Sequence, residues 1–314
     1  MAYTTIDDPT LYFSTTLWTG DGSDDRDIVV AGTGMQPDWV WIKERTGTGY
    51  HFMFDTVRGA TKNLHTNTDA AESTQADALQ AFNSDGFEIG TDGDINANTV
   101  TYVAWSWKAG TAVSGNTSGS GTAKAYSGSV NTDAGFSIIT YIGNGTGGHA
   151  IPHHLGVAPK MIIVKNRANT ISWPVYHHGI GNERFIYLDT TGASGDDTAW
   201  NDTTPTSSVF TMASTDNNNN AEANIAYCFA EKQGYSKFGS YTSNSNADGP
   251  FVYLGFKPAF LMVKCTTAAE GWAMADSTRE PTNDGAIQTL DANGNSAEGS
   301  LVIDFLSNGF KPRE

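Results

Sequence analysis

The chain has 314 residues, with 34 glycines, 17% charged residues and a formal net charge of −16. Nucleic-acid binding needs clustered Lys and Arg to displace counterions, and no run of three basic residues occurs here. The acidic charge gives no attraction to an anionic membrane surface, and no run of 18 apolar residues is present. These features argue against nucleic-acid binding and against membrane insertion.

A repeat divides the chain into three units. Three segments share a proline, an apolar stretch and a lysine six residues after the proline, here called the framing lysine: 37–43, 159–165 and 258–264. A phenylalanine follows these lysines by 44, 45 and 46 residues: Phe87, Phe210 and Phe310. A further aromatic residue follows the first two lysines by 62 and 64 residues: Trp105 and Phe229. Spacing held this closely through different sequence is typical of a duplicated structural unit.

Unit 1 is expected over residues 1–110. It begins with a head strand of alternating pattern at 12–20, continues through the proline-led strand at 37–43 and ends in a closing strand around Trp105. The Ala-rich stretch 69–82 predicts a short helix, because Ala favours helices and two apolar side chains lie three residues apart.

Residues 111–123 are mainly Gly, Ser and Thr, which predicts a flexible linker and some movement of unit 1. Unit 2 is expected at 124–234 and unit 3 at 235–314, with so little slack between them that they should pack rigidly. In unit 3 the closing strand would fall beyond Glu314. We therefore expect unit 3 to lack this strand, and its sheet edge to be completed by another chain or by a longer product of the same gene.

Many turn residues and 11% aromatic residues favour an all-β fold. Each unit is predicted to contain about seven short antiparallel strands in a jelly-roll-like β-sandwich, together with one short helix. Such sandwiches serve unrelated functions, so the fold class does not decide the function.

One pattern of residues carries a family resemblance. It consists of Pro37-Asp-Trp-Val-Trp-Ile-Lys43, His51, Asp55, Arg58-Gly59, Leu64, Asn67, Glu72, Ser84-Asp-Gly-Phe87 and Tyr102-Val-Ala-Trp-Ser-Trp-Lys-Ala-Gly110, with companion segments at 227–231, 235–241 and 306–310. The pattern resembles an uncharacterised domain family of virion and tail-fibre-like proteins of bacteriophages, notably marine ones. The resemblance implies a protein that is made in the host cytoplasm and placed in the phage particle, and it implies no reaction.

Two units carry a candidate site. An aspartate and an arginine stand 12 and 15 residues after the framing lysine in units 1 and 3: Asp55 and Arg58, Asp276 and Arg279. In unit 2 the same positions hold His177 and Ile180. Each pair, with His51 or Trp272 beside it, is a candidate for binding a sugar hydroxyl or a carboxylate. The alternative is an internal pair that orders a tight loop, and we prefer it because duplication inside a repeat is typical of scaffold.

No metal or cofactor is predicted. Histidines cluster at 149, 153–154 and 177–178 without the spacing of a metal site. Residues 92–96 begin like a calcium loop, but Ala97 stands where that loop needs Gly. A structural Ca²⁺ held by other acidic turns stays an alternative.

The two cysteines, Cys228 and Cys265, lie in apolar segments, which predicts buried free thiols, with an inter-strand bridge as the alternative. Five tryptophans are candidates either for stacking on sugars or, the preferred interpretation, for core packing: Trp105, Trp107, Trp173, Trp200 and Trp272.

Signatures of common enzymes are missing from the sequence, including the nucleophile elbow, the phosphate-binding loop and the zinc-protease motif. We expect a non-enzymatic bacteriophage virion structural protein, in first place a tail fibre or a tail-associated host-recognition component. The alternatives are a carbohydrate-binding or glycan-depolymerising module that acts on host surface glycans, and a capsid-surface decoration protein. The expected partners are other virion proteins and further copies of the chain, with a trimer as the first expectation.

Overall fold

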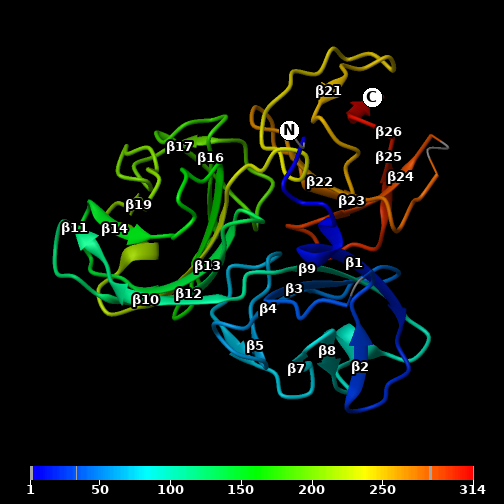
Figure 1. Ribbon diagram of the computed structural model, residues 1–314, viewed down its shortest axis with the longest axis horizontal. Helices are drawn as coiled ribbons and strands as arrows, with labels where there is room; N and C mark the ends of the chain where they lie inside the picture. Colours follow the sequence, from blue (N-terminus) through cyan, green and yellow to red (C-terminus); the bar gives the residue numbers. More distant parts are fainter. Residues whose placement is uncertain (1–2, 33, 283–284, 314) are drawn as a thin grey trace.

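The computed structural model describes residues 3–32, 34–282 and 285–313. Strands dominate it, and three lobes, coloured in chain order from blue through green to red, surround a common centre (Figure 1). The lobes are the three repeat units. The prediction of an all-β fold with antiparallel sheets is confirmed.

Unit 1 is a sandwich of two antiparallel sheets and a small hairpin. The larger sheet has the strand order β1-β9-β3-β4, the smaller one has the order β2-β8-β7, and β5 pairs with β6. The strands are β1 (Phe13–Thr19), β2 (Arg26–Val29), β3 (Trp39–Glu44), β4 (His51–Asp55), β5 (Lys62–Asn63), β6 (Ser73–Thr74), β7 (Leu79–Asn83), β8 (Gly86–Ile89) and β9 (Thr101–Trp107). Two short helices precede β1 and β9: η1 (Pro9–Leu11) and α1 (Gly93–Asn96).

Unit 2 repeats this plan with a wider sheet. Its larger sheet has the order β10-β12-β13-β20-β15-β16-β17-β18, and its smaller sheet has the order β11-β14-β19. The elements are β10 (Thr111–Asn116), β11 (Ser118–Gly119), β12 (Ala125–Asn131), β13 (Phe136–Ile142), β14 (His149–Pro152), β15 (Met161–Asn166), β16 (Pro174–His177), β17 (Arg184–Tyr187), β18 (Gly195–Asp196), β19 (Val209–Met212), η2 (Asp216–Asn218) and β20 (Ala223–Phe229).

Unit 3 has two smaller sheets, with the orders β22-β23-β24-β25 and β21-β27-β26. Its strands are β21 (Val252–Tyr253), β22 (Phe260–Lys264), β23 (Trp272–Asp276), β24 (Ile287–Asp291), β25 (Gly299–Leu301), β26 (Ile303–Leu306) and β27 (Gly309–Pro312). Among the described residues, the core between these sheets has four buried apolar side chains, whereas units 1 and 2 have fifteen each. Unit 3 is therefore the least filled of the three sandwiches.

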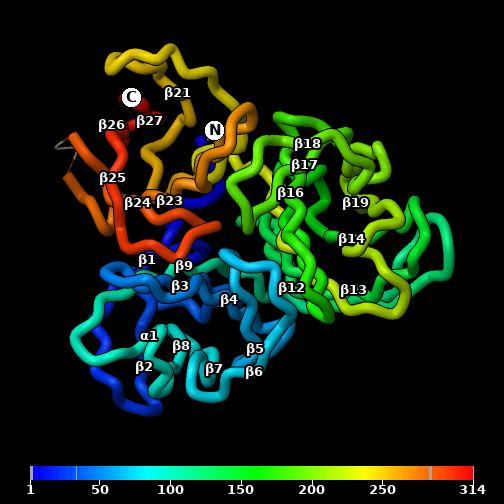
Figure 2. The backbone as a smooth tube through the Cα atoms, turned by 180° about the vertical axis from the view of Figure 1, so that it is seen from behind, coloured from blue at the N-terminus to red at the C-terminus, as the bar shows by residue number. Residues whose placement is uncertain are grey.

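The larger sheets of units 1 and 2 are apolar on both faces. In β3, Trp39 and Trp41 point to a core shared by all units, while Val40 and Ile42 point to the interior of unit 1. This two-residue alternation explains why the proline-led segments are apolar almost throughout. The shared core holds 21 buried residues from all three units. The view from behind shows the three lobes meeting at the centre of the molecule (Figure 2).

Strand pairing corrects one equivalence. Trp105 pairs with Trp41, and Tyr227 pairs with Ile163. Trp41 and Ile163 both stand two residues before a framing lysine. The counterpart of Trp105 is therefore Tyr227, which lies at the same distance of 62 residues from its lysine, and not Phe229.

The prediction of a helix at 69–82 is wrong. The segment contains β6 and β7 instead, and Leu79 is buried and pairs with Ile89 of β8. The preference of Ala for helices is weak, so pairing with a neighbouring strand in the sandwich outweighs it.

The prediction of a flexible linker at 111–123 is also wrong. Residues 111–116 form β10, which pairs along its whole length with β12, and residues 118–119 form β11. Thr, Val and Ser suit an exposed edge strand, so a composition typical of linkers is also compatible with β structure. Because the chain runs from β9 directly into a sheet of unit 2, units 1 and 2 are joined without slack.

Within the described residues, none of the helices has the length and apolar character needed to cross a lipid bilayer.

Candidate functional site

One aromatic side chain in each unit binds the next unit. His51, Trp173 and Trp272 all stand eight residues after a framing lysine. Each ring nitrogen reaches a main-chain oxygen of a neighbouring unit: His51 Nε2 and Asp291 O at 3.0 Å, Trp173 Nε1 and Thr68 O at 2.9 Å, Trp272 Nε1 and Tyr187 O at 2.8 Å. Unit 1 thus binds unit 3, unit 2 binds unit 1 and unit 3 binds unit 2. The three units form a closed ring with pseudo-threefold symmetry.

The protonation of His51 follows from its contacts. The indole Nε1 of Trp41 lies 2.8 Å from His51 Nδ1. An indole N–H can only donate, so Nδ1 accepts and the hydrogen is on Nε2, which donates to Asp291 O. Burial lowers the pKa of His51 well below its usual value. His51 is therefore a neutral connector between units 1 and 3.

The Asp55–Arg58 pair lies in the interface between units 1 and 2. One carboxylate oxygen of Asp55 accepts from the main-chain N–H of Arg58 at 2.8 Å, and the other accepts from Arg58 Nε at 2.5 Å. The hydroxyl of Tyr227 in closing strand β20 of unit 2 donates to the same carboxylate at 2.7 Å. Burial by itself lowers the pKa of Arg58, but the electrostatic attraction of Asp55, Tyr227 and Glu72 and the hydrogen bond to Asp55 together outweigh it and raise the pKa.

The Asp276–Arg279 pair repeats this geometry between units 3 and 1. Asp276 accepts from the main-chain N–H of Arg279 at 2.8 Å and from its Nε at 2.6 Å. Trp105 in closing strand β9 of unit 1 donates its indole N–H to Asp276 at 3.0 Å. The guanidinium of Arg279 lies over the Trp105 ring, 5.2 Å from its centre. Each pair therefore receives a hydrogen bond from the closing strand of the neighbouring unit.

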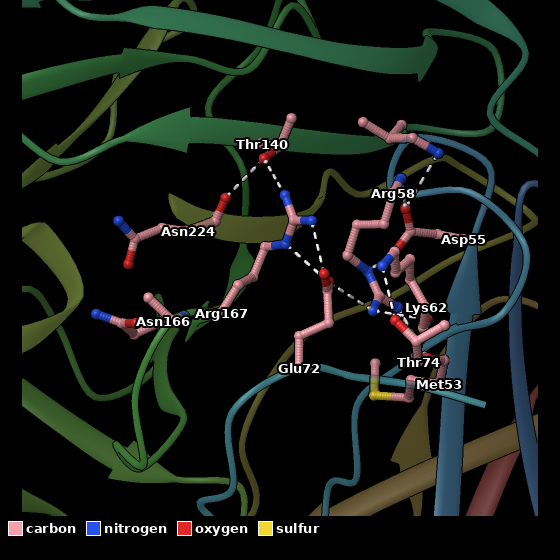
Figure 3. A network of polar contacts seen from close by, with 12 residues as sticks. Met53, Asp55, Arg58, Lys62, Glu72, Thr74, Thr140, Asn166, Arg167 and Asn224 are labelled. Carbon is pink, nitrogen blue, oxygen red and sulfur yellow. Dashed lines mark hydrogen bonds and ion pairs between the residues drawn. The ribbon is translucent and has the colours of Figure 1, made fainter. Parts of the chain in front are cut away.

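A glutamate extends each pair across the interface. Glu72 contacts Arg58 of its own unit at 3.2 Å and Arg167 of unit 2 at 2.8 Å (Figure 3). Burial raises the pKa of Glu72, but the hydrogen bonds and charge of the two arginines lower it by more. The four side chains of Asp55, Arg58, Glu72 and Arg167 form one continuous chain of opposite charges.

The same chain of charges occurs between units 3 and 1. Glu298 contacts Arg279 of its own unit at 3.1 Å and Arg45 of unit 1 at 2.8 Å. Arg45 and Arg167 both stand two residues after a framing lysine, so the partner arginines are also equivalent by position.

A main-chain hydrogen bond recurs at all three interfaces. The N–H of Glu72 donates to Arg167 O at 3.0 Å, and the N–H of Glu298 donates to Arg45 O at 2.8 Å. Between units 2 and 3 the N–H of Ser194 donates to Thr266 O at 3.0 Å, and uncharged residues stand in place of the charged ones. Ser194 and Thr266 thus occupy the places of the glutamate and the partner arginine. His177 and Ile180 occupy the places of the aspartate and its arginine. The charged chain is absent at the interface where the described residues of unit 3 supply no closing strand to meet it.

The six residues proposed as a ligand site all lie in these interfaces. His51, Asp55 and Asp276 are fully buried, and Trp272, Arg279 and Arg58 are 4%, 7% and 8% exposed. The contacts described above occupy their polar atoms. The geometry favours internal pairs that hold the units together over a surface that binds a ligand.

Residues 8–314 match the model of a family described as "Domain of unknown function (DUF7483)". The chain belongs to this DUF7483 family. The match runs through all three units, so the DUF7483 model covers more than a single repeat. Neither the curated proteins nor the solved structures that were searched gave a match.

The interface roles of two groups of residues in the DUF7483 ring were not predicted from the sequence. Two of the framing lysines bind loop carbonyls of a neighbouring unit: Lys165 Nζ donates to Asp69 O of unit 1 at 2.9 Å, and Lys264 Nζ donates to Thr191 O of unit 2 at 2.9 Å, whereas Lys43 binds carbonyls of its own unit. Burial lowers the pKa of Lys165 to about 8. The bridging acids Glu72 and Glu298 were also missed. The fixed spacing signals the lysines, but nothing near the two glutamates in the sequence indicates which arginine each one meets.

The histidine clusters do not converge. His149 lies between the side chains of Asn218 and Thr117, each at 2.7 Å, and His153 contacts the carbonyl of Thr206 at 3.1 Å. In the part of the chain that the structure describes, no three His, Cys, Asp or Glu side chains are grouped so as to hold a metal ion. In segment 92–96, Asp92 caps helix α1 and Asn96 ties it to neighbouring loops.

The remaining candidates are resolved by burial. Trp105, Trp173, Trp200 and Trp272 are buried, and Trp107 is half-buried against the shared core. Both cysteines are free thiols, one buried (Cys228) and one half-buried (Cys265) just after β22. Cys265 is thus more exposed than expected.

Proposed function

We propose that the chain is a non-enzymatic structural protein of a bacteriophage virion, built into a tail fibre or a tail-associated host-recognition structure. The place in the particle rests on the resemblance described above. One observation supports the structural role. The recurrent acidic and basic side chains are buried in the interfaces between units, where they form ion pairs with each other. A catalytic or binding group must contact a substrate, whereas in the described part of the chain these groups contact one another and the neighbouring units.

Purified phage particles test this proposal. Antibodies against the chain, coupled to gold, are expected to decorate the tail of intact virions, and the protein is expected in their mass spectrum. Decoration of the capsid surface would favour the decoration-protein alternative. A chain found only in the infected-cell lysate and never in washed particles would contradict a virion role.

One observation favours glycan binding as a second candidate. A shallow pocket of about 280 Å³ is lined by Tyr3, Gln233, Lys237 and Tyr253, together with neighbouring residues of unit 3 and of the segment before it. Tyr3 and Tyr253 are 53% and 61% exposed. Flat aromatic faces beside amide and ammonium donors suit a sugar ring, which has an apolar face and hydroxyl groups at its edge.

A glycan array with the purified chain tests the second candidate. Tyr253→Ala is expected to abolish any binding that depends on this pocket. Tyr50→Ala is the matched control, because Tyr50 is an exposed tyrosine of unit 1 outside the lining of this pocket. Equal loss of binding in both variants, or none in either, would exclude the pocket as the site.

A further inference from the structure

Strand β22 of unit 3 is paired on one side only within the described residues. It pairs with β23, and it stands at the end of its sheet. Its counterparts β3 and β15 are inner strands, flanked on the other side by the closing strands β9 and β20. Every residue of β22 is part-exposed, whereas every residue of β15 is buried. The position next to β22 that a closing strand occupies in units 1 and 2 is therefore not filled by a described strand, and it is here called the open place.

The backbone groups that face this place can be identified from the other units. In unit 1 the N–H of Arg45 donates to Thr101 O of β9 at 2.8 Å, and in unit 2 the N–H of Arg167 donates to Ala223 O of β20 at 2.9 Å. The main-chain N–H and C=O groups of successive residues point to opposite sides of a strand. The groups of every second residue before Arg45 and Arg167 therefore also point to the closing strand. In β22 the equivalent residues are Phe260, Met262 and Lys264. Their main-chain N–H and C=O groups point into the open place.

The head segment of unit 3 also lacks its usual strand pairing. In units 1 and 2 the head strands β1 and β13 pair with the outer side of the closing strand. The corresponding segment of unit 3, residues 238–244, has no strand structure and is largely exposed. Without the strand between them, neither β22 nor the head segment has its usual neighbour.

Units 1 and 2 also define the strand that fits. Both closing strands have seven residues, Thr101–Trp107 and Ala223–Phe229, run antiparallel to their neighbours and place apolar side chains on both faces. In units 1 and 2 the strands with this pattern, β9 and β20, are inner strands of their own sheets, so neither is free to be donated to a second copy. This favours a partner protein as the donor.

We propose that the open place beside β22 binds an extended apolar strand of a partner protein, antiparallel to β22, with the side-chain pattern of β9 and β20. The added strand would complete the larger sheet of unit 3 and give the head segment a pairing partner. Such strand addition draws its affinity from main-chain hydrogen bonds and its specificity from the alternate side chains. This inference does not depend on the location of the protein in a virion.

The full chain and a synthetic peptide with the sequence 221–231, in which Ser replaces Cys228, test the inference. In the free chain, the amides of Phe260, Met262 and Lys264 are expected to exchange with deuterium at least about a hundredfold faster than those of Trp39, Trp41 and Lys43. Adding the peptide is expected to slow their exchange to the rate of the unit 1 amides. A peptide methylated on the nitrogens that face β22 is expected to have no effect.

A protein variant gives a second, independent measurement. Met262→Pro removes the N–H that points into the open place and also a side chain that packs against the shared core, so Met262→Ala serves as the control for the lost side chain. Only the proline variant is expected to lose peptide binding. If the free monomer already protects the three β22 amides, its own residues fill the place and the inference is overturned. Protection that appears only in a dimer identifies a second copy as the occupant and overturns it as well. Binding of the peptide and of its methylated form with equal affinity would also contradict strand addition.

Discussion

Removing the guanidinium of Arg58 should destabilise the chain strongly if the charged interfaces hold the ring together. The side chain is fully buried, and it donates to Asp55, to Glu72 and to the main-chain oxygens of Lys62 and Met53. Arg58→Met keeps most of the apolar volume and removes all these donors. The Asp55 carboxylate then remains buried with only the Tyr227 hydroxyl and main-chain N–H groups as partners.

The expected loss can be estimated from comparable buried pairs. Breaking one by removing a single partner costs about 3 to 5 kcal/mol, because an uncompensated charge stays in the interior. For a urea dependence of about 3 kcal/mol per molar, the unfolding midpoint should fall by about 1 to 1.7 M. Tryptophan fluorescence is a suitable signal, since Trp39, Trp41 and Trp105 all lie in the shared core that these interfaces enclose.

Two further variants decide whether the charge is the cause. The double variant Asp55→Asn/Arg58→Met is expected to be more stable than Arg58→Met alone, because it removes the uncompensated carboxylate. Arg184→Met is the control, since Arg184 is exposed, reaches Ser194 Oγ at a long 3.4 Å and should leave the midpoint nearly unchanged. A midpoint for Arg58→Met equal to that of Arg184→Met would refute the reasoning.

Three other predictions follow from burial and composition. Burial lowers the pKa of His51 well below its usual value and that of His153 to about 4, so as the pH falls below about 6.5 only the unfolded chain takes up protons at these two histidines. The free energy of unfolding should therefore drop by about 1 to 2 kcal/mol per histidine between pH 7 and pH 5. Urea titrations at both pH values should show a smaller drop for His51→Gln. Hydrogen bonds from Thr267 lower the pKa of the half-buried Cys265, whereas burial raises that of Cys228, so one thiol should react with Ellman's reagent in the native chain and the second only after unfolding. The expected homo-oligomer should show a mass above 33.5 kDa in light scattering at micromolar concentration. A single species of 33.5 kDa would contradict the expected oligomer.

The sequence by itself determined the repeat and the class of fold. The proline-to-lysine spacing identifies one inner strand in each unit, and the two-residue alternation within it reflects a sheet that is buried on both faces. These features are local, because a strand's pattern depends on which faces its own side chains present. The same local rules failed at 69–82 and 111–123, where pairing with β8 and β12 outweighed helix propensity and a linker-like composition.

Only the tertiary structure decided what the recurrent charged residues do. The spacing of Asp55 and Arg58 shows that they recur, but their third partner, Tyr227, lies 172 residues away in the chain. Trp105 and Asp276 are separated by 171 residues. No local pattern encodes such contacts, because they exist only when three sandwiches close into a ring. That closure turns a candidate binding pair into a buried interface. The structure also shows that, among the described residues, β22 of the third unit pairs on one side only.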